Sequence, residues 1–163
     1  MTLKLSNSPL EMIIDDEDYE RCSRHKWVLI GHRGSRIFAT IRKKSVGIGR
    51  FLLGYKGNLT IDHIDRNFLN CRKENLRIAT LSQNNANKLK QPGRSSIYKG
   101  VTWNKKNKVW IAHIVVKGKF IYLGTFRIES EAGLAYNKAA IKYFKEFAVL
   151  NNIEKGENVP KCG

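Results

Sequence analysis

The stretch that decides the fold covers residues 61–85 and reads IDHIDRNFLNCRKENLRIATLSQNN. Asp62 and His63 interrupt a short apolar segment over residues 59–64, and a polar loop leads from there to a second apolar segment at 76–79. Two side chains of catalytic type therefore lie between short apolar segments, next to a loop rich in polar residues.

A helix is expected to follow the second apolar segment. Thr80 or Ser82 is suited to be the N-cap of a helix that begins near Gln83, because its side-chain oxygen can accept a hydrogen bond from a free backbone N–H of the first turn. This helix carries Asn84, and the preceding loop carries Asn75. Both amides are candidates for a role beside the Asp-His pair.

The Asp-His pair has the chemistry that phosphodiester cleavage requires. Such a reaction needs a base to activate water and a cation to neutralise charge on the phosphate and the leaving oxygen. Neighbours on a strand point to opposite faces, so a strand end or a bulge is needed to bring both side chains to one site. Carboxylate and amide oxygens are hard ligands, which favour Mg²⁺, Mn²⁺ or Ca²⁺ over zinc. By itself, such a pair is more often a hydrogen-bonded structural feature, and asparagines are common in loops and caps.

The charge of the chain favours a polyanionic partner. Lys and Arg total 30 against 14 acidic residues, a formal net charge of +16, and the pI is near 10.0. Residues 1–20 contain one lysine and six acids, a net charge of −5, so the remaining residues carry +21. The acidic N-terminal patch is expected to face away from phosphates, and nucleic acid is the commonest polyanion. The alternative at this point is a ribosomal-type or merely basic protein.

Composition also bounds the class of protein. Hydrophobic residues make up 42% and charged residues 27%, which is typical of a globular chain rather than a disordered one. Cys22, Cys71 and Cys162 form no CxxC pair, which counts against a zinc knuckle or a disulfide framework and fits a reducing compartment. The sequence has no apolar run of about 18 residues and no signal-peptide core. The chain is therefore expected to be soluble and cytoplasmic, with no membrane partner.

A linker is predicted at residues 91–96, QPGRSS, because proline, glycine and serines between periodic segments favour a break. The expected first domain covers residues 1–90, the second covers 97–151, and residues 152–163 form a tail. In the first domain the pattern predicts a short acidic helix and three strands with basic loops between them, over residues 15–22, 27–30, 37–41 and 46–53.

The second domain has the pattern of a hairpin followed by a helix. Strands at 108–116 and 119–123 flank Lys117-Gly118, a two-residue turn in which glycine can take a positive φ. The resulting register puts two sets of residues on opposite faces: His113, Val115, Phe120 and Tyr122 on one, and Ala112, Ile114, Ile121 and Leu123 on the other. From Ser130 onward, small and aromatic residues recur at helical spacing, namely Ala132, Ala135, Tyr136, Ala139, Ala140 and Tyr143. This stripe is expected to cover one sheet face and to leave the other for a partner.

The residues of the 61–85 stretch resemble the HNH nuclease family, in particular its homing-endonuclease branch of phages and introns. They are Ile61-Asp62-His63-Ile64-Asp65, Asn70, Glu74-Asn75-Leu76-Arg77, Thr80 and Ser82-Gln83-Asn84. The resemblance implies a ββα-metal fold over about 46–90 and one divalent ion, Mg²⁺ or Mn²⁺, in each active site. It implies His63 as general base, Asp62 and Asn84 as metal ligands, and Asn75 as the residue that braces the loop and orients the base, with Asn70 supporting the loop.

The same resemblance implies a phosphate contact for Arg50, upstream of the central motif. Many relatives have His-Arg at this point, whereas this chain has Gly49-Arg50. An accessory histidine is therefore absent, although the Asp-His, Asn and Asn positions of the central motif are all present.

The second half resembles an AP2 DNA-binding domain over residues 97–151. The resemblance is carried by Tyr98-Lys99-Gly100-Val101, Trp110, Ala112, Ile114, Leu123-Gly124-Thr125-Phe126, Glu131-Ala132, Ala135-Tyr136, Ala139-Ala140 and Phe147-Ala148-Val149-Leu150-Asn151. The family implies a three-stranded antiparallel sheet packed on one helix, with the open sheet face in the major groove of double-stranded DNA. The expected fold class of the whole chain is thus α+β, an HNH domain followed by an AP2-like domain.

Candidate DNA contacts follow from the AP2 resemblance. Lys99 and Tyr122 stand where plant factors have a contacting Arg and Trp. Further contact positions, usually Arg, Glu or similar, are occupied by Thr102, Asn104, His113, Val115 and Phe120. Lys105, Lys106, Lys117 and Lys119 are expected to bind phosphates, which position the domain without specifying sequence. Trp103 is a further candidate contact, for which core packing is the alternative. Core packing is favoured for Trp110, because hairpin parity puts it on the helix side.

These expectations combine into a metal-dependent HNH endonuclease that nicks or cleaves double-stranded DNA, of homing or phage type and targeted by an AP2 domain. It is expected to act as a monomer or a homodimer on no small-molecule substrate, in a bacterial or phage-infected cytoplasm. The alternative is a non-catalytic sequence-specific DNA-binding protein with a degenerate nuclease half, which the missing histidine favours. A basic RNA-binding protein is disfavoured, because neither half carries aromatic stacking motifs of the RNA-binding type.

Overall fold

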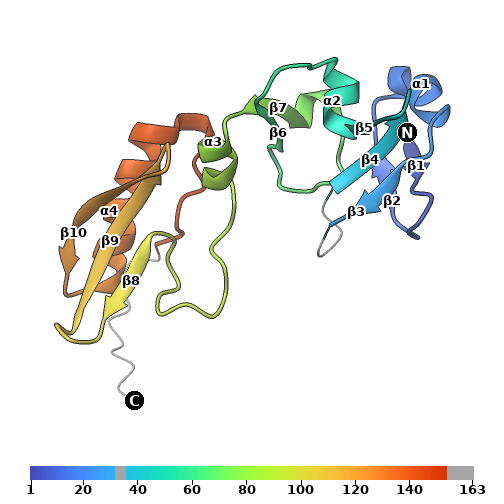
Figure 1. The fold of residues 1–163 in the computed structure, drawn as a ribbon. Coiled ribbons are helices and arrows are strands. Elements are labelled where there is room, and N and C mark those ends of the chain that lie inside the picture. Colours follow the sequence, from blue (N-terminus) through green and yellow to red (C-terminus); the bar gives the residue numbers. More distant parts are fainter. Residues whose placement is uncertain (32–35, 154–163) are drawn as a thin grey trace. The chain divides into compact units, whose positions relative to one another are not determined.

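The computed structural model describes residues 1–31 and 36–153, so Cys162 and most of the predicted tail lie outside the described residues. The chain forms two compact units, Met1–Thr80 and Leu81–Gly163. Both units combine short antiparallel strands with few helices, a mixed content of helix and sheet (Figure 1).

The first unit contains three small antiparallel sheets, ordered β1–β2, β3–β4–β5 and β6–β7. Its elements are β1 (Thr2–Lys4), β2 (Glu11–Ile13), η1 (Asp16–Asp18), α1 (Tyr19–Ser23), β3 (Val28–Ile30), β4 (Arg36–Ile41), β5 (Lys44–Gly47), α2 (Ile48–Leu53), β6 (Thr60–His63), η2 (Lys73–Asn75) and β7 (Leu76–Ala79). The acidic helix expected over 15–22 is confirmed as η1 and α1, and the strands expected at 27–30 and 37–41 are confirmed as β3 and β4.

The strand predicted over residues 46–53 is wrong in its second half, because only the residues up to Gly47 are extended and α2 follows. Ile48 and Leu52, one helical turn apart, are both buried, so the apolar run fits a buried helix as well as a buried strand. Gly54 ends the helix with a φ of +62° and donates its N–H to the carbonyls of Arg50 and Phe51.

The core of the first unit holds the polar loop of the central motif in place. Cys71, which lies within this loop, is fully buried in one cluster with Met12 and Trp27. The Ile13 N–H donates to the Leu69 carbonyl at 2.7 Å, and the Cys71 N–H donates to the Ile13 carbonyl at 2.8 Å. The loop is therefore attached to the edge of β2 before the chain enters β7.

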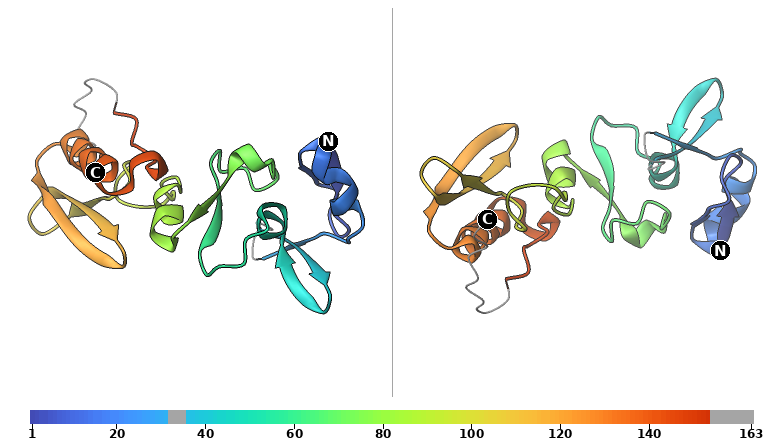
Figure 2. Two further views of the ribbon diagram at one scale, coloured as in Figure 1. Left: turned by 90° about the horizontal axis from the view of Figure 1, so that it is seen from above. Right: turned by 90° about the horizontal axis from the view of Figure 1, so that it is seen from below.

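The second unit is a three-stranded antiparallel sheet covered on one face by a long helix (Figure 2). Its elements are α3 (Leu81–Ala86), β8 (Val101–Asn104), β9 (Val109–Val116), β10 (Lys119–Phe126), α4 (Glu129–Phe144) and η3 (Lys145–Phe147). The predicted hairpin register is confirmed, with Lys119 opposite Val116 and Tyr122 opposite His113. Both turn residues, Lys117 and Gly118, have positive φ, as a tight hairpin turn requires.

The two faces of this sheet differ as the parity predicted. Ala112 and Ile114 are buried, whereas Val115, Phe120 and Tyr122 are exposed. The predicted place of Trp110 is confirmed, since it packs with the buried cluster on the helix side. On α4 the predicted stripe is buried at Ala132, Tyr136, Ala139 and Ala140. The prediction for Tyr143 is wrong: its side chain is 40% exposed, and Phe144 is the last buried residue of the helix.

Helix α3 belongs by its contacts to the second unit, although the predicted linker starts ten residues later. The Lys99 ammonium donates to the carbonyls of Ala86 at 2.5 Å and Lys88 at 2.6 Å. The Val149 N–H also donates to the Ala86 carbonyl, and the Lys117 N–H donates to the Ser82 hydroxyl. The last carbonyls of a helix have no hydrogen-bond partners within the helix. Lys99 and the Val149 N–H supply such partners at the end of α3 and so hold this helix in the second unit. Across residues 1–31 and 36–153, no helix is long and apolar enough to cross a membrane.

Candidate active site

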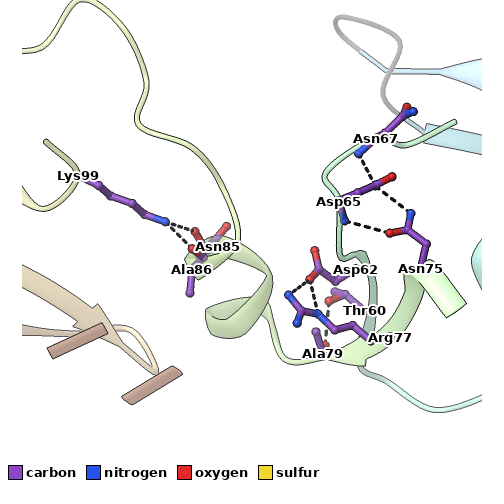
Figure 3. A network of polar contacts seen from close by, with 10 residues as sticks. All are labelled: Thr60, Asp62, Asp65, Asn67, Asn75, Arg77, Ala79, Asn85, Ala86 and Lys99. Carbon is purple, nitrogen blue, oxygen red and sulfur yellow. Dashed lines mark hydrogen bonds and ion pairs between the residues drawn. The ribbon is translucent and has the colours of Figure 1, made fainter. Parts of the chain in front are cut away.

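Asp62 is buried at the centre of the β6–β7 hairpin, directly opposite Arg77. The Arg77 Nε and Nη2 atoms both lie 2.9 Å from the Asp62 Oδ2 atom (Figure 3). The Thr60 hydroxyl donates to the Ala79 carbonyl at 2.8 Å and fastens the open end of the hairpin. The guanidinium supplies the counter-charge that a carboxylate needs when it leaves water.

His63 is the last residue of β6, where the strand gives way to the polar loop. Burial lowers the pKa of its imidazole, and the charges of Asp65 and Asp62 oppose this effect. The side chain is therefore mostly neutral near pH 7, which is the form that can accept a proton. Its Nε2 atom lies 3.9 Å from the Sγ atom of Cys71, whose thiol pKa burial raises to about 12.

Asn75 closes the polar loop at its base. Its side-chain oxygen accepts the Asp65 N–H at 3.0 Å, and its amide nitrogen donates to the Asp65 Oδ1 atom at 2.9 Å and to the Asn70 carbonyl at 2.7 Å (Figure 3). The Asn75 carbonyl accepts the Ile64 N–H at 2.9 Å. The residue after His63 is thus bonded to the far end of the loop, as a bracing role requires.

Asp65 also holds the polar loop together through its side chain. Its carboxylate accepts hydrogen bonds from the Asn67 N–H at 2.8 Å, the Asn70 amide at 2.8 Å and the Asn75 amide at 2.9 Å. Desolvation raises the pKa of Asp65, but these hydrogen bonds, from Asn70, Asn67 and Asn75, and the charge of His63 outweigh it and lower the pKa. The predicted support by Asn70 therefore takes the form of a bond to this carboxylate.

Arg50 lies on α2 and contacts the segment that leads into β6. Its guanidinium donates to the Gly57 carbonyl at 2.6 Å and to the Leu59 carbonyl, and its Cζ atom lies 5.3 Å from the centroid of the Tyr55 ring. A side chain at the preceding position has no room, because a Cβ on Gly49 would lie 2.7 Å from the Ile61 Cγ2 atom. Close packing of α2 on β6 therefore leaves no room here for the histidine that many relatives have at this position.

The candidate metal ligands are one carboxylate and one amide. Asp62 lies in β6, and Asn84 lies half-buried in α3 of the second unit. Within the described residues, no group of three or more His, Cys, Asp or Glu side chains could hold a metal ion. One Asp and one Asn suit Mg²⁺, which usually keeps several waters and binds few protein ligands together with substrate phosphate. The donor set therefore fits Mg²⁺ or Mn²⁺ and not a zinc site.

Three aspartates of the N-terminal segment have polar partners. Asp18 lies 2.6 Å from the Arg21 guanidinium and 3.0 Å from the Lys73 ammonium. Asp15 accepts the Lys73 N–H at 2.8 Å, and Asp16 accepts the terminal ammonium of Met1 at 2.6 Å. Asp15 and Asp18 therefore fasten the N-terminal segment to Lys73, which lies in the polar loop of the central motif.

The predicted DNA contacts of the second unit fall into three groups. Thr102, Asn104, His113 and Tyr122 lie on the open sheet face, where the His113 ring stacks on Phe120 at 4.7 Å. The four lysines expected on phosphates are exposed, at the β8–β9 loop and the β9–β10 turn: Lys105, Lys106, Lys117 and Lys119. Lys99 and Trp103 are placed otherwise. Lys99 holds α3, and Trp103 lies against Trp110 on the helix side, with ring centroids 4.8 Å apart.

Comparison with known proteins identifies the class of this protein. The HNH endonuclease family matches residues 52–86, the span from α2 to the end of α3. Over 136 residues the chain is 33% identical to an uncharacterized HNH endonuclease of Acanthamoeba polyphaga mimivirus, which covers 81% of this chain and 70% of that protein. The chain therefore belongs to the HNH endonuclease family, and its mixed helix and sheet content is compatible with that assignment.

Shorter similarities link the chain to two other groups of proteins. It is 37% identical over 59 residues to Protein 3.8 of Escherichia phage T7, which is 36% of this chain and 49% of that protein. It is 46% identical over 50 residues to APETALA2-like protein 2 of Oryza sativa subsp. indica, which is 31% of this chain and 12% of that protein.

Two residues of the site were missed from the sequence. The sequence indicates Arg77 only as part of the motif and not as the ion-pair partner of Asp62. It indicates no role for Asp65. A signal existed for the first: in an antiparallel hairpin that pairs residue 60 with residue 79, Arg77 must lie opposite Asp62. The three hydrogen bonds to Asp65 have no such signal, because they depend on how the loop folds.

Proposed function

We propose that this endonuclease hydrolyses phosphodiester bonds of double-stranded DNA with one divalent ion, Mg²⁺ or Mn²⁺. The observation that carries the proposal is a half-buried His63 with a lowered pKa at the end of β6, next to the ion-paired Asp62. An imidazole with a lowered pKa can take a proton from water near pH 7. The excess of basic residues, +16 in all, supports a polyanionic substrate.

The proposed active site belongs to the ββα-metal arrangement expected over about residues 46–90. His63 accepts the proton of the water that attacks the phosphorus atom, and the scissile bond to the 3′ oxygen breaks to leave a 5′ phosphate. Asp62 and Asn84 would hold the divalent ion, which when bound neutralises charge on the phosphate and the leaving oxygen. Asn75 keeps the loop closed behind His63, so the imidazole keeps its orientation during the proton transfer.

Arg50 has two proposed tasks in this scheme. Its hydrogen bonds to the Gly57 and Leu59 carbonyls hold the segment that enters β6. A guanidinium has five N–H donors, so others remain for a phosphate oxygen of the substrate. Loss of Arg50 should therefore weaken both the position of β6 and the binding of DNA.

The second unit is proposed to be an AP2-like domain that holds the enzyme on DNA. Its open sheet face, with Tyr122 and Phe120 exposed beside exposed lysines, fits a major groove flanked by phosphates. Similarity to APETALA2-like protein 2 supports this proposal. Similarity to proteins of a phage and of a giant virus supports a homing or phage role, in the cytoplasm of a bacterial or infected cell.

The test is conversion of supercoiled plasmid by wild type and by His63→Ala, each with Mg²⁺, with Mn²⁺ and with EDTA. We expect nicked or linear product from wild type with either ion, and none from the variant or with EDTA. The matched control is His25→Ala, a histidine that contacts Trp27 and Phe51 outside the motif and should keep full activity. Equal, trace conversion by wild type and His63→Ala would remove the catalytic assignment.

Binding is measured separately, by fluorescence anisotropy of a short duplex in EDTA. If roughly six phosphates are neutralised, the affinity should fall with salt with a log–log slope of about −5. A flat salt response would contradict the proposed electrostatic contact with DNA. Binding that persists in EDTA while cleavage stops would assign the metal to catalysis.

A further inference from the structure

A cavity of about 500 Å³ opens in the second unit, between residues 90–95 and the sheet. One wall consists of Lys90, Arg94 and Ser95, from the predicted linker and the residue before it. The other wall consists of Thr102 on β8 and His113 on β9, both at the open sheet face. The linker therefore does not simply connect two parts of the chain, because it forms a site with the sheet.

The lining of this cavity is basic. Burial lowers the pKa of Lys90, and the charge of Arg94 lowers it further. Burial lowers the pKa of His113 as well, and the charge of Lys90 adds to that effect. None of the described residues that line the cavity is acidic. The acid that favours the Lys90 charge is Glu129, whose Oε1 atom accepts the Ile97 N–H at 3.0 Å.

Two polar groups of the lining can serve a ligand. The Nδ1 atom of His113 is buried and has no hydrogen-bond partner among the described residues. A buried polar atom without a partner costs free energy unless a ligand or water satisfies it. The Ser95 hydroxyl accepts the Trp103 N–H at 3.0 Å, which leaves its own proton to donate. Positive charges held together in a cavity, beside unused hydrogen-bonding capacity, are the chemistry of an anion site.

We propose that this cavity binds one backbone phosphate of the duplex, with Lys90, Arg94 and His113 as its ligands. The inference rests on the proposed function, because the phosphate belongs to the DNA that lies on the open sheet face. His113 joins the two surfaces, since its ring stacks on Phe120 of that face while its Nδ1 atom belongs to the cavity lining. The linker thus adds a contact that fixes the register of the DNA on the sheet.

The experiment compares two double variants of equal charge by duplex binding in EDTA over a range of salt concentrations. The first is Lys90→Ala/Arg94→Ala. The matched control is Lys138→Ala/Lys142→Ala, at exposed positions of α4, the helix that covers the opposite face of the sheet. We expect the first variant to bind about tenfold more weakly than the control, as for one lost charge-assisted hydrogen bond. Its salt slope should fall in magnitude by about 1, as for one lost phosphate contact.

A second readout follows the His113 ring by NMR in the wild-type chain, with duplex DNA and with inorganic phosphate as probes. We expect the duplex to raise the pKa of His113 and the Lys90→Ala/Arg94→Ala variant to abolish this rise. A response to inorganic phosphate but not to the duplex would overturn the DNA assignment.

A third variant separates the two proposals. Lys119→Ala/Tyr122→Ala changes two exposed side chains of β10 outside the cavity lining, Lys119 beside the hairpin turn and Tyr122 on the open sheet face. If this variant loses affinity while Lys90→Ala/Arg94→Ala behaves like the α4 control, the phosphate pocket is refuted and the DNA-binding face stands. If the wild type shows no salt-dependent binding at all, both proposals fail.

Discussion

Replacement of Arg77 by methionine should strongly destabilise the first unit. Asp62 and Arg77 form a buried ion pair, with side-chain exposures of 5% and 15% and an N–O distance of 2.9 Å. Removal of one partner from such a pair costs about 3–5 kcal/mol, because the other charge stays buried without compensation. Since water reaches part of the Arg77 side chain, we expect the lower end, about 3 kcal/mol.

For a unit of this size, about 1 kcal/mol corresponds to roughly 4–8 °C in melting temperature, so Arg77→Met should lower the melting temperature by about 12 °C or more. The assay is scanning calorimetry together with urea unfolding. The control is Arg24→Met, which removes the Arg24–Glu20 pair whose side chains are 68% and 83% exposed. Loss of this exposed ion pair should lower the free energy of unfolding by at most about 1 kcal/mol.

Two further measurements connect this result with the proposed metal site. The double variant Asp62→Asn/Arg77→Met lacks the buried Asp62 charge as well, so its free energy of unfolding should return most of the way to the wild-type value. Added Mg²⁺ should also stabilise Arg77→Met more than wild type, because a cation on Asp62 replaces the missing guanidinium. The reasoning is refuted if Arg77→Met is within about 1 kcal/mol of wild type and indistinguishable from Arg24→Met.

Two other predictions concern the packing of α2 and the polar loop. Gly49→Ala should lower the free energy of unfolding by about 1–3 kcal/mol, because its Cβ would lie 2.7 Å from the Ile61 Cγ2 atom. Helix propensity alone would raise stability by about 1 kcal/mol, so a gain in urea unfolding contradicts the packing argument. Asp65 has a lowered pKa in the folded chain, so its contribution to stability is present above its unfolded pKa of about 3.9 and is lost as the pH falls through the folded value. The stability difference between wild type and Asp65→Asn should therefore be constant near pH 6 and shrink below about pH 4, and a difference unchanged down to pH 2.5 would exclude this role.

Sequence reasoning was most successful where a local rule decides the structure. The Lys117-Gly118 turn sets the register of β9 and β10, and parity then assigns the side chains near the turn to a face, as far as the bulge between Tyr122 and Gly124. The same kind of rule assigned Trp110 to the helix side. The order of β6, polar loop, β7 and α3 was likewise predicted from the 61–85 stretch, because apolar segments and caps follow one another along the chain.

Other features depend on contacts that no local pattern encodes. Residues 48–53 form a helix because Ile48 and Leu52 both reach the core, although the same apolar run could have formed a strand. Helix α3 belongs to the second unit because Lys99, far along the chain, binds its last carbonyls. Lys99 was predicted to contact DNA, but its ammonium is used inside the unit.

The residue types of the active site were therefore determined by the sequence alone, because a carboxylate, an imidazole and amides at these positions define the chemistry that is available. Tertiary structure decided their state. Partial burial lowers the pKa of the His63 imidazole, the facing strand supplies Arg77 to Asp62, and the loop bonds Asn75 and Asn70 to Asp65. Desolvation and hydrogen bonding act over a few ångströms between residues distant in sequence, so they appear only once the chain is folded.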